Sequence, residues 1–427
     1  MATEDSPWAC NANDALAIQV VRAHDDKTSL ATEQPFHPLF TYPIYGEEEK
    51  IYGYKDLKID LRVASGSLAT YFAVSHSAKL AAGTVDDAEG KLKDKLSTDI
   101  CRSEDEFSSR VEQDALSFRP PGRKIASYVR AAELSKGKGR VNATTSEDDD
   151  NAVVYEVYHA TWSTPGFTEY HRRMQLFILL LIEGGSYLNE DEDKWEFVLL
   201  FERRRRSDTA RTAVYHFIGY SSLYPFFYFP DKVRMRLSQF IILPPYQKQG
   251  HGSELYEAIY VYVLGHPDIA ELSVEDPAEA FEDLRDKCDL NMLLAHESFM
   301  AEASGIVPAT LSNSAVPSKG KPGAKRSRRP RTALGPPTDR AWAEQWRLRL
   351  KLASRQYHRL IEMLILRSIG PNNEKGMRAY RLQVKERLYR FNYEIMVQME
   401  KEERLEKLEE TFQNVREDYQ RILAHVR

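Results

Sequence analysis

The most informative chemistry lies in a short loop between a predicted strand and a predicted helix. The strand ends near Ile242, and the loop reads Gln247-Lys248-Gln249-Gly250-His251-Gly252-Ser253 before the helix begins. Gly250 and Gly252 allow a tight turn and a close approach to a ligand. The start of the helix offers unpaired N–H groups and the positive end of its dipole. This arrangement suits a pyrophosphate, although a plain glycine-containing turn explains the same residues.

The loop matches neither of two common nucleotide-binding patterns. It lacks the GxxxxGK[ST] of a P-loop and the GxGxxG of a dinucleotide fold, so ATP and NAD are poor candidates. A second feature is the pair Glu275 and Asp276, which ends a predicted strand in SVEDP. Because side chains alternate along a strand, the two carboxylates leave on different faces. One can act as a base, while Asp276 can equally cap the following helix.

These residues belong to a chain of 427 residues and 49.2 kDa, long enough for two to three domains. We expect a mixed domain over 8–134, a linker over 135–151, an aromatic-rich catalytic domain over 152–300, a basic break over 301–340 and a helical region over 341–427. Predicted strands cover 17–21, 51–63, 70–77, 195–204, 212–230, 234–245 and 269–277, and a strand also follows a helix within 171–184. Predicted helices cover 103–116, 124–134, 251–265 and 278–294, and an apolar seam runs from Leu405 to Ile422 at helical spacing.

Composition excludes several classes of protein. Lys and Arg number 59 against 64 Asp and Glu, so the net charge of −5 gives no overall field that would attract DNA. Three widely spaced cysteines argue against a disulfide scaffold and a cysteine-based zinc site, and we expect no metal. The longest apolar run, 176–182, is too short for a bilayer, and we expect no secretory signal, since no basic stretch followed by an apolar run occurs in the first 20 residues. We therefore expect an intracellular protein that binds no membrane.

Longer stretches of sequence resemble one known family. SQFIILPPYQKQGHGSELYEAIY (238–260) and SVEDPAEAFEDLRD (273–286) are similar to the type B histone acetyltransferase catalytic subunits of the GNAT superfamily, in particular the fungal ones. IYGYKDLKI (51–59) and EERLEKLEETF (402–412) resemble the two ends of that family. The resemblance covers most of the chain apart from 135–150 and 301–340. It implies an α/β (α+β) GNAT fold with a mixed twisted sheet.

The resemblance also implies a cofactor and a reaction. Acetyl-CoA would be held by the backbone of Phe240, Ile241 and Ile242 and by the loop from Gln247 to Ser253. Glu275 would be the general base that takes a proton from a substrate lysine. Asp276 and Glu183 match the other carboxylates considered for this step, although Glu183 can equally be the partner of a nearby arginine.

The implied substrate is the tail of newly synthesised histone H4, together with H3. Residues of the tail groove would be Glu48, Glu49, Lys50, Trp195, Tyr224, Pro225 and Phe226. The acidic runs 47–49 and 190–193 complement a basic peptide, but solvated loops would look the same. Since aromatic runs are usually core, we expect at least half of the rings in 224–229 to be buried.

The family further implies a WD-repeat histone-binding subunit and a location in cytoplasm and nucleus. The basic run 325–331 can be an import signal, a nucleic-acid contact or a solvated linker. Two other functions stay open: a histone-binding scaffold without activity, and a GNAT enzyme that acts on another amine. The presence of Glu275 and of the glycine loop argues against the scaffold.

Overall fold

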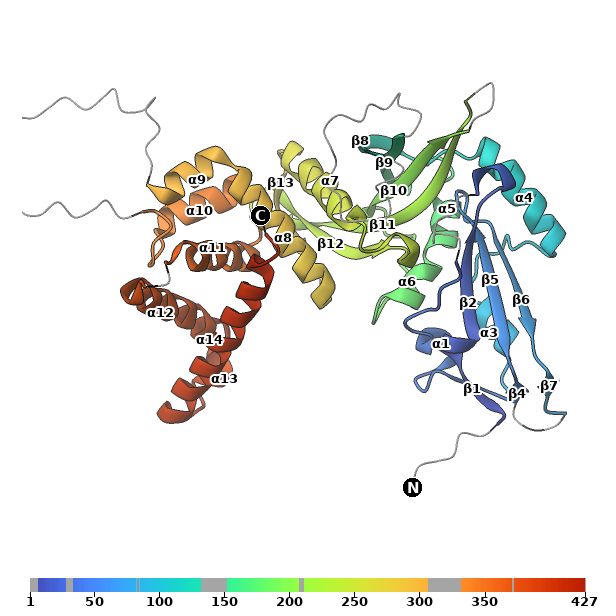
Figure 1. Ribbon diagram of the computed structural model, residues 1–427, viewed down its shortest axis with the longest axis horizontal. Helices are drawn as coiled ribbons and strands as arrows, with labels where there is room; N and C mark the ends of the chain where they lie inside the picture. The colour runs from blue at the N-terminus through green and yellow to red at the C-terminus, as the bar shows by residue number, and fades with distance from the viewer. Residues whose placement is uncertain are drawn as a thin grey trace, which may run out of the picture. The chain divides into compact units, whose positions relative to one another are not determined.

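The computed structural model describes residues 7–27, 34–81, 83, 85–131, 152–206, 211–305, 332–370 and 372–426. The chain forms two compact units (Figure 1). Unit 1 comprises Met1–Phe226 and Arg236–Tyr262, and unit 2 comprises Phe227–Met235 and Val263–Arg427. The predicted linker over 135–151 and basic run over 325–331 lie outside the described residues. The functional subdivision at 134 and 300 stays a prediction.

The N-terminal part of unit 1 is built on a three-stranded sheet. Its order is β2 (Leu16–Val21), β5 (Lys58–Ala64) and β6 (Thr70–Ser75), with β2 parallel and β6 antiparallel to β5. Alternate residues of β2 and β5 are buried, as expected for strands with one face on a core. Shorter elements complete this part: β1 (Ala9–Asn11), α1 (Ala12–Ala15), η1 (His24–Asp26), α2 (Tyr42–Tyr45), β3 (Lys50–Tyr52), β4 (Tyr54–Lys55), β7 (Ala78–Lys79), α3 (Ala88–Lys93) and α4 (Glu104–Ser117).

A larger sheet carries the predicted catalytic residues. Its strands are β8 (Arg123–Ala131), β9 (Ala152–Thr161), β10 (Glu196–Arg205), β11 (Ala213–Tyr228), β12 (Lys232–Ile242) and β13 (Ile269–Val274), in the order β13-β12-β11-β10-β9-β8. The middle of β10, from Phe197 to Phe201, is fully buried. Two helices in unit 1, α5 (Phe167–Met174) and α6 (Leu176–Leu181), bury most of their apolar side chains. The predicted α+β class is confirmed.

Helix α7 (His251–Gly265) begins in unit 1 and ends in unit 2, where helices dominate. They are α8 (Glu279–Ala295), α9 (Glu297–Ser304), α10 (Arg340–Arg349), α11 (Ser354–Ser368), α12 (Glu374–Phe391), α13 (Tyr393–Met396) and α14 (Lys401–Leu423). The predicted seam on α14 is largely confirmed, since Leu408, Phe412, Tyr419 and Ile422 are buried. Leu405 is 54% exposed and lies outside it.

Two secondary-structure predictions were wrong. Residues 123–131 form the strand β8 and not a helix, because their backbone pairs with β9 from Arg123 opposite His159 to Ala131 opposite Ala152. Tertiary pairing here overrides a weak helical propensity. Residues 171–184 contain α5 and α6 in succession, with no strand after them. Within the predicted break, 301–304 complete α9, and Leu334 is buried.

Candidate functional site

The predicted phosphate loop has the strand–turn–helix form that its sequence indicates. After β12, a short 3-10 helix (Pro244–Tyr246) leads into a turn in which Lys248 and Gly250 have φ angles of 60° and 86°. Helix α7 then starts at His251. The positive φ explains the need for glycine at 250. Ser253 is half-buried in the first turn of α7.

Two glutamines of this loop use their side chains to hold its shape. Gln247 donates from Nε2 to the Ile242 carbonyl at 2.8 Å, and Gln249 donates to the Pro245 carbonyl at 2.8 Å. Their amide nitrogens are therefore engaged within the loop. If these two residues bind a cofactor, their backbone groups are the ones left to do so, and that role stays a prediction.

Arg130, on β8, is a residue that sequence reasoning missed. Its Nη1 donates to the Gln249 carbonyl at 2.6 Å, and its Nη2 lies 3.4 Å from Glu254 Oε1. A Cβ atom added at Gly250 would lie 3.4 Å from the same guanidinium group. The arginine thus places a positive charge directly beside the glycine turn. The contact joins residues 119 positions apart, so no local pattern could have revealed it.

The side chain of His251 is buried and is therefore not available for contact with a cofactor. The ring is 1% exposed, and its Nδ1 lies 2.7 Å from the hydroxyl of Tyr128. Burial, reinforced by the charge of Arg130, lowers the pKa of His251 to about 3. A neutral imidazole packed against Tyr155, at a centroid distance of 4.7 Å, anchors the start of α7. The predicted cofactor role of His251 can therefore rest only on its backbone.

A buried ionic network contacts Tyr246, the residue that precedes the loop. Arg22, the residue that follows β2, donates from Nη2 to Glu202 Oε2 at 2.8 Å and to the hydroxyl of Tyr246 at 2.9 Å. Arg204 bonds the other oxygen of Glu202. Burial would raise the pKa of Glu202, but the charges of Arg22 and Arg204 outweigh it and hold that pKa well below its usual range. Tyr246 directly precedes the loop, so the N-terminal sheet helps to position it.

The predicted cofactor strand lies at the end of β12. Ile241 and Ile242 are buried and Phe240 is half-buried. The β11 strand approaches here through Gly219, where an added Cβ would overlap the Ile241 carbonyl. A glycine is thus required for this part of the sheet to close, which keeps the backbone of 240–242 in a defined place.

The predicted bases lie in different parts of the chain. Glu275 and Asp276 directly follow β13 in unit 2 and are exposed, and Asp276 has a φ of 32°. Glu183 is exposed in unit 1, in the turn after α6, where the Tyr42 hydroxyl accepts a 2.6 Å hydrogen bond from the Gly184 N–H. No arginine is bonded to Glu183 among the described residues. The three carboxylates keep their predicted roles as hypotheses.

Of the predicted substrate residues, Glu49 has a clear structural task. Its Oε1 accepts from the N–H groups of Thr41 and Tyr42, at 2.6 and 3.1 Å, and its Oε2 accepts from Asn13. Burial raises the pKa of Glu49, but these hydrogen bonds outweigh it and lower the pKa overall. Glu49 therefore caps the start of α2, while Glu48 and Lys50 are exposed beside it.

The aromatic run 224–229 is not core, so that prediction was wrong. None of its five rings is buried, and Phe226 is 38% exposed. The rings of Trp195 and Tyr224 meet at 4.8 Å, those of Tyr224 and Phe226 at 4.9 Å, and the Arg236 guanidinium lies 4.1 Å from the Phe226 centroid. Together with Pro225, these side chains form a half-exposed aromatic ledge in unit 1.

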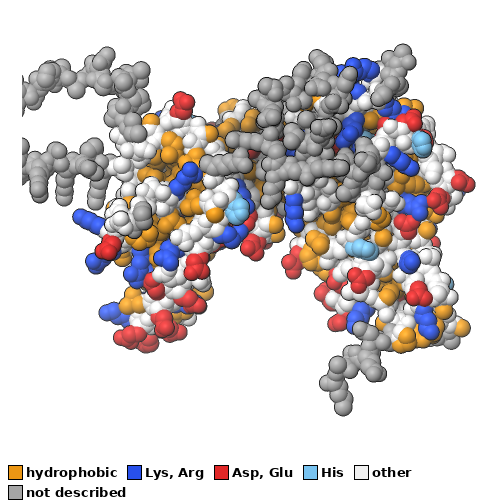
Figure 2. Space-filling view, viewed as in Figure 1, with side chains coloured by type: hydrophobic (Ala, Val, Ile, Leu, Met, Phe, Trp, Pro, Cys, Tyr) orange, Lys and Arg blue, Asp and Glu red, His pale blue; other side chains and the backbone are white. Residues whose placement is uncertain are grey.

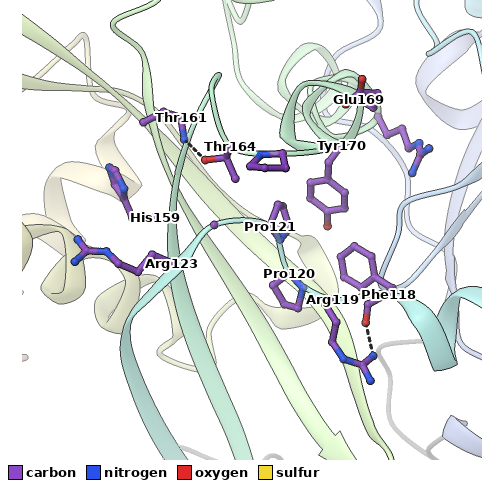
Figure 3. Close-up of a pocket in the computed structure, with 14 residues that line it drawn as sticks. Phe118, Arg119, Pro120, Pro121, Arg123, His159, Thr161, Thr164, Glu169 and Tyr170 are labelled. Carbon is purple, nitrogen blue, oxygen red and sulfur yellow. Dashed lines mark hydrogen bonds between the residues drawn. The ribbon is translucent and has the colours of Figure 1, made fainter.

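A separate groove of about 760 Å³ lies elsewhere in unit 1, between the segment 118–123, the end of β9 and the start of α5 (Figure 3). Pro120 and Pro121 lie in its centre, and Thr161 donates its N–H to Thr164 at its edge. None of the predicted site residues lines it. We therefore assign the candidate site to the loop and not to this groove.

The loop has three features that suit a phosphate group. It combines a glycine turn with positive φ, the N-terminus of the 15-residue helix α7 and the guanidinium of Arg130. Within the described residues, no group of three or more His, Cys, Asp or Glu side chains could hold a metal ion. No described helix is both long enough and apolar enough to cross a bilayer.

Comparison with known proteins identifies the family. Residues 8–183 match the family model described as histone acetyl transferase HAT1 N-terminus, and residues 329–369 match that of the fungal HAT1 C-terminal region. Similar proteins named histone acetyltransferase type B catalytic subunit occur in Cryptococcus neoformans (48% identity, 99% of both chains), Mycosarcoma maydis (44%, 96% of this chain and 87% of the relative) and Kluyveromyces lactis (31%, 98% and 93%). The chain therefore belongs to the family of histone acetyltransferase type B catalytic subunits and is an acetyltransferase.

Proposed function

We propose that the protein transfers acetyl groups from acetyl-CoA to lysines in the N-terminal tail of newly synthesised histone H4 that is not yet in nucleosomes. The observation that carries this proposal is the glycine turn with Arg130 beside it, in a chain whose relatives are named type B histone acetyltransferases. The family name supports histone as the substrate class. The choice of H4 rests on the family resemblance.

The proposed mechanism is direct attack of a lysine amine within a ternary complex. Acetyl-CoA would supply the thioester carbonyl that the amine attacks; the new C–N bond would replace the C–S bond, and coenzyme A would leave as its thiolate. A lysine with a pKa of ~10.4 is protonated near neutral pH, so a base must take its proton. We assign that task to Glu275, with Asp276 and Glu183 as alternatives. Backbone N–H groups of 240–242 can stabilise negative charge on the carbonyl oxygen.

The substrate tail is basic, and exposed acidic and aromatic groups suit it. Glu48 is an exposed carboxylate, and the aromatic ledge of Trp195, Tyr224 and Phe226 offers ring faces to lysine and arginine side chains. We include Lys50 and Pro225 in this surface. Because Glu49 is engaged in capping α2, we propose that it shapes the surface and does not bind the tail directly.

We further propose the partners and the location that the family suggests. The partners would be histone H4 with H3 and a WD-repeat histone-binding subunit, with no direct contact to DNA or membrane. The protein would act in cytoplasm and nucleus. Capture of the tagged chain from cells, followed by mass spectrometry, tests the partners, and imaging of a fluorescent fusion tests the location.

One assay separates this function from the two alternatives. Purified protein is incubated with labelled acetyl-CoA and, in parallel, free core histones, nucleosomes and small primary amines. The proposal expects label on free H4 and little on nucleosomes or small amines. Label on small amines alone would favour a different amine substrate. Histone binding without any label would favour a scaffold.

A further inference from the structure

A second groove, of about 730 Å³, lies within unit 2 between α10, α11 and α12. Residues 337–344 form one wall, the first two turns of α11 form the floor, and α12 from Gln383 to Phe391 forms the other wall. Figure 2 shows Lys and Arg side chains gathered over α12, whereas acidic side chains gather at the lower end of α14. No predicted site residue lines this groove.

Each carboxylate in the groove is already paired. Glu362 accepts two hydrogen bonds from Arg387, at 2.7 and 2.8 Å. Glu344 accepts two from Arg347, at 2.9 and 2.8 Å. Glu386 is bonded by both Arg340 and Arg390. The negative charge of the groove is therefore neutralised by the protein itself.

Arg355 is a positive charge in the groove that is not paired with any of these three carboxylates. It is exposed on the first turn of α11, and its guanidinium lies 4.7 Å from the ring centroid of Phe391. Among the described residues it has no carboxylate partner. Phe391 is itself 61% exposed at the lip of the groove. The lip of the groove thus presents an arginine beside an exposed phenylalanine ring, and both residue types are enriched in protein interfaces.

Tyr357 gives a second, independent sign of a ligand. The residue is 1% exposed and lines the groove, yet its hydroxyl has no hydrogen-bond partner within the part of the chain that the structure describes. A buried donor without a partner is costly to a folded protein. An acceptor oxygen supplied from the groove would satisfy it.

We propose that this groove binds a segment of a partner protein in which an acidic side chain lies beside an apolar one. The carboxylate pairs with Arg355 and accepts from Tyr357, while the apolar side chain packs against Phe391 and Ile361. A peptide fits better than a small molecule, because small ligands are usually buried by 70–90% and the walls here are exposed. Proteins commonly bind an amphipathic peptide helix in a groove of this kind. The charge of the groove excludes the basic histone tail as its occupant.

The test uses the full chain and a labelled 15-residue peptide of glutamates with leucines at helical spacing. A peptide with lysines in place of the glutamates is the reference. Fluorescence anisotropy should show saturable binding of the acidic peptide that weakens with salt, and no binding of the basic one. Arg355→Glu and Phe391→Ala should each weaken binding by about tenfold or more. Arg367→Glu, an exposed change twelve residues further along α11 and outside the groove, should leave it unchanged.

Tyr357→Phe separates binding from folding. Loss of an unsatisfied hydroxyl should keep or raise the melting temperature of the free protein, yet weaken peptide binding several-fold. Equal affinity of wild type, Arg355→Glu and Tyr357→Phe would overturn the proposal. So would equal binding of an all-glutamate peptide without leucines, or full displacement by inorganic phosphate, since either would mark a simple anion site.

Discussion

Arg347 and Glu271 form a buried ion pair, with Nη1 and Oε2 2.8 Å apart and both side chains 7% exposed. Glu271 lies on β13, four residues before the proposed base Glu275. The backbone continues this support, because the Leu272 N–H donates to the Lys351 carbonyl at 2.9 Å. The segment that joins α10 to α11 therefore runs alongside β13. The C-terminal helices thus help to fix the strand that carries Glu275.

The first prediction concerns this ion pair. Arg347→Met leaves the buried Glu271 with the half-exposed Arg234 as its one ion-pair partner in the described part of the chain, so the free energy of unfolding should fall by about 3 kcal/mol. Chemical denaturation measures it. The exposed neighbour Arg349 provides the control variant Arg349→Met, with little effect expected. Adding Glu271→Leu to Arg347→Met should recover part of the loss, and no recovery would argue that packing matters more than charge.

The second prediction concerns the glycine turn. Gly250→Asp forces a side chain into a backbone with φ of 86° and adds negative charge where phosphates are expected, so acetyl-CoA should bind at least tenfold more weakly. Isothermal titration calorimetry gives the dissociation constant. Gly370→Asp, at an open exposed position without positive φ, is the matched control. An unchanged constant in a folded Gly250→Asp protein would remove the loop from the site.

The third prediction concerns Arg130. Arg130→Met removes the hydrogen bond to the Gln249 carbonyl and a positive charge, so the KM for acetyl-CoA should rise by roughly tenfold, with kcat at saturating acetyl-CoA nearly unchanged. Arg130→Lys should recover part of the affinity. Arg123→Met, at the exposed start of the same strand, should match wild type. A fall in kcat with a constant KM would instead place Arg130 in the chemical step.

The fourth prediction separates two neighbouring glutamates. Since hydrogen bonds lower the pKa of Glu49 in the folded state, its stabilisation is present above the pKa of the unfolded state and is lost as the pH falls through the folded pKa. Glu49→Gln should cost ~1 kcal/mol at neutral pH and weaken the acid dependence of unfolding. Glu48→Gln should leave stability intact but raise the KM for an H4 tail peptide. The reverse pattern would contradict these assignments.

The sequence correctly predicted those features that depend on residues close together in the chain. The loop from Gln247 to Ser253 was found because glycine and proline mark turns, and β10 was found because its apolar run is continuous. Arg130 was missed because its contact with the loop depends on how distant strands pair. The helix predicted over 124–134 failed for the same reason, since pairing with β9 determines that segment.

The aromatic run was misjudged for a different reason. Tyr224 and Phe226 look like core residues in the sequence, yet they lie near the end of the long strand β11, where Tyr224 is half-buried and Phe226 is exposed. An aromatic residue type tells us that burial is favourable, but it does not tell us where in the fold that residue lies. The capping role of Glu49 was likewise hidden, because its partners Thr41 and Asn13 are not adjacent in sequence.

The proposed general base offers the most direct test. Glu275→Gln keeps the shape of the side chain and removes the proton acceptor, so kcat on an H4 tail peptide should fall by ~10²–10⁴-fold while the dissociation constant for acetyl-CoA stays the same. The residual rate should rise with pH, because more substrate amine is then neutral. Asp276→Asn and Glu183→Gln serve as parallel variants, each with a smaller expected loss. Wild-type turnover and an unchanged pH profile in Glu275→Gln would contradict the assignment of Glu275 as the base.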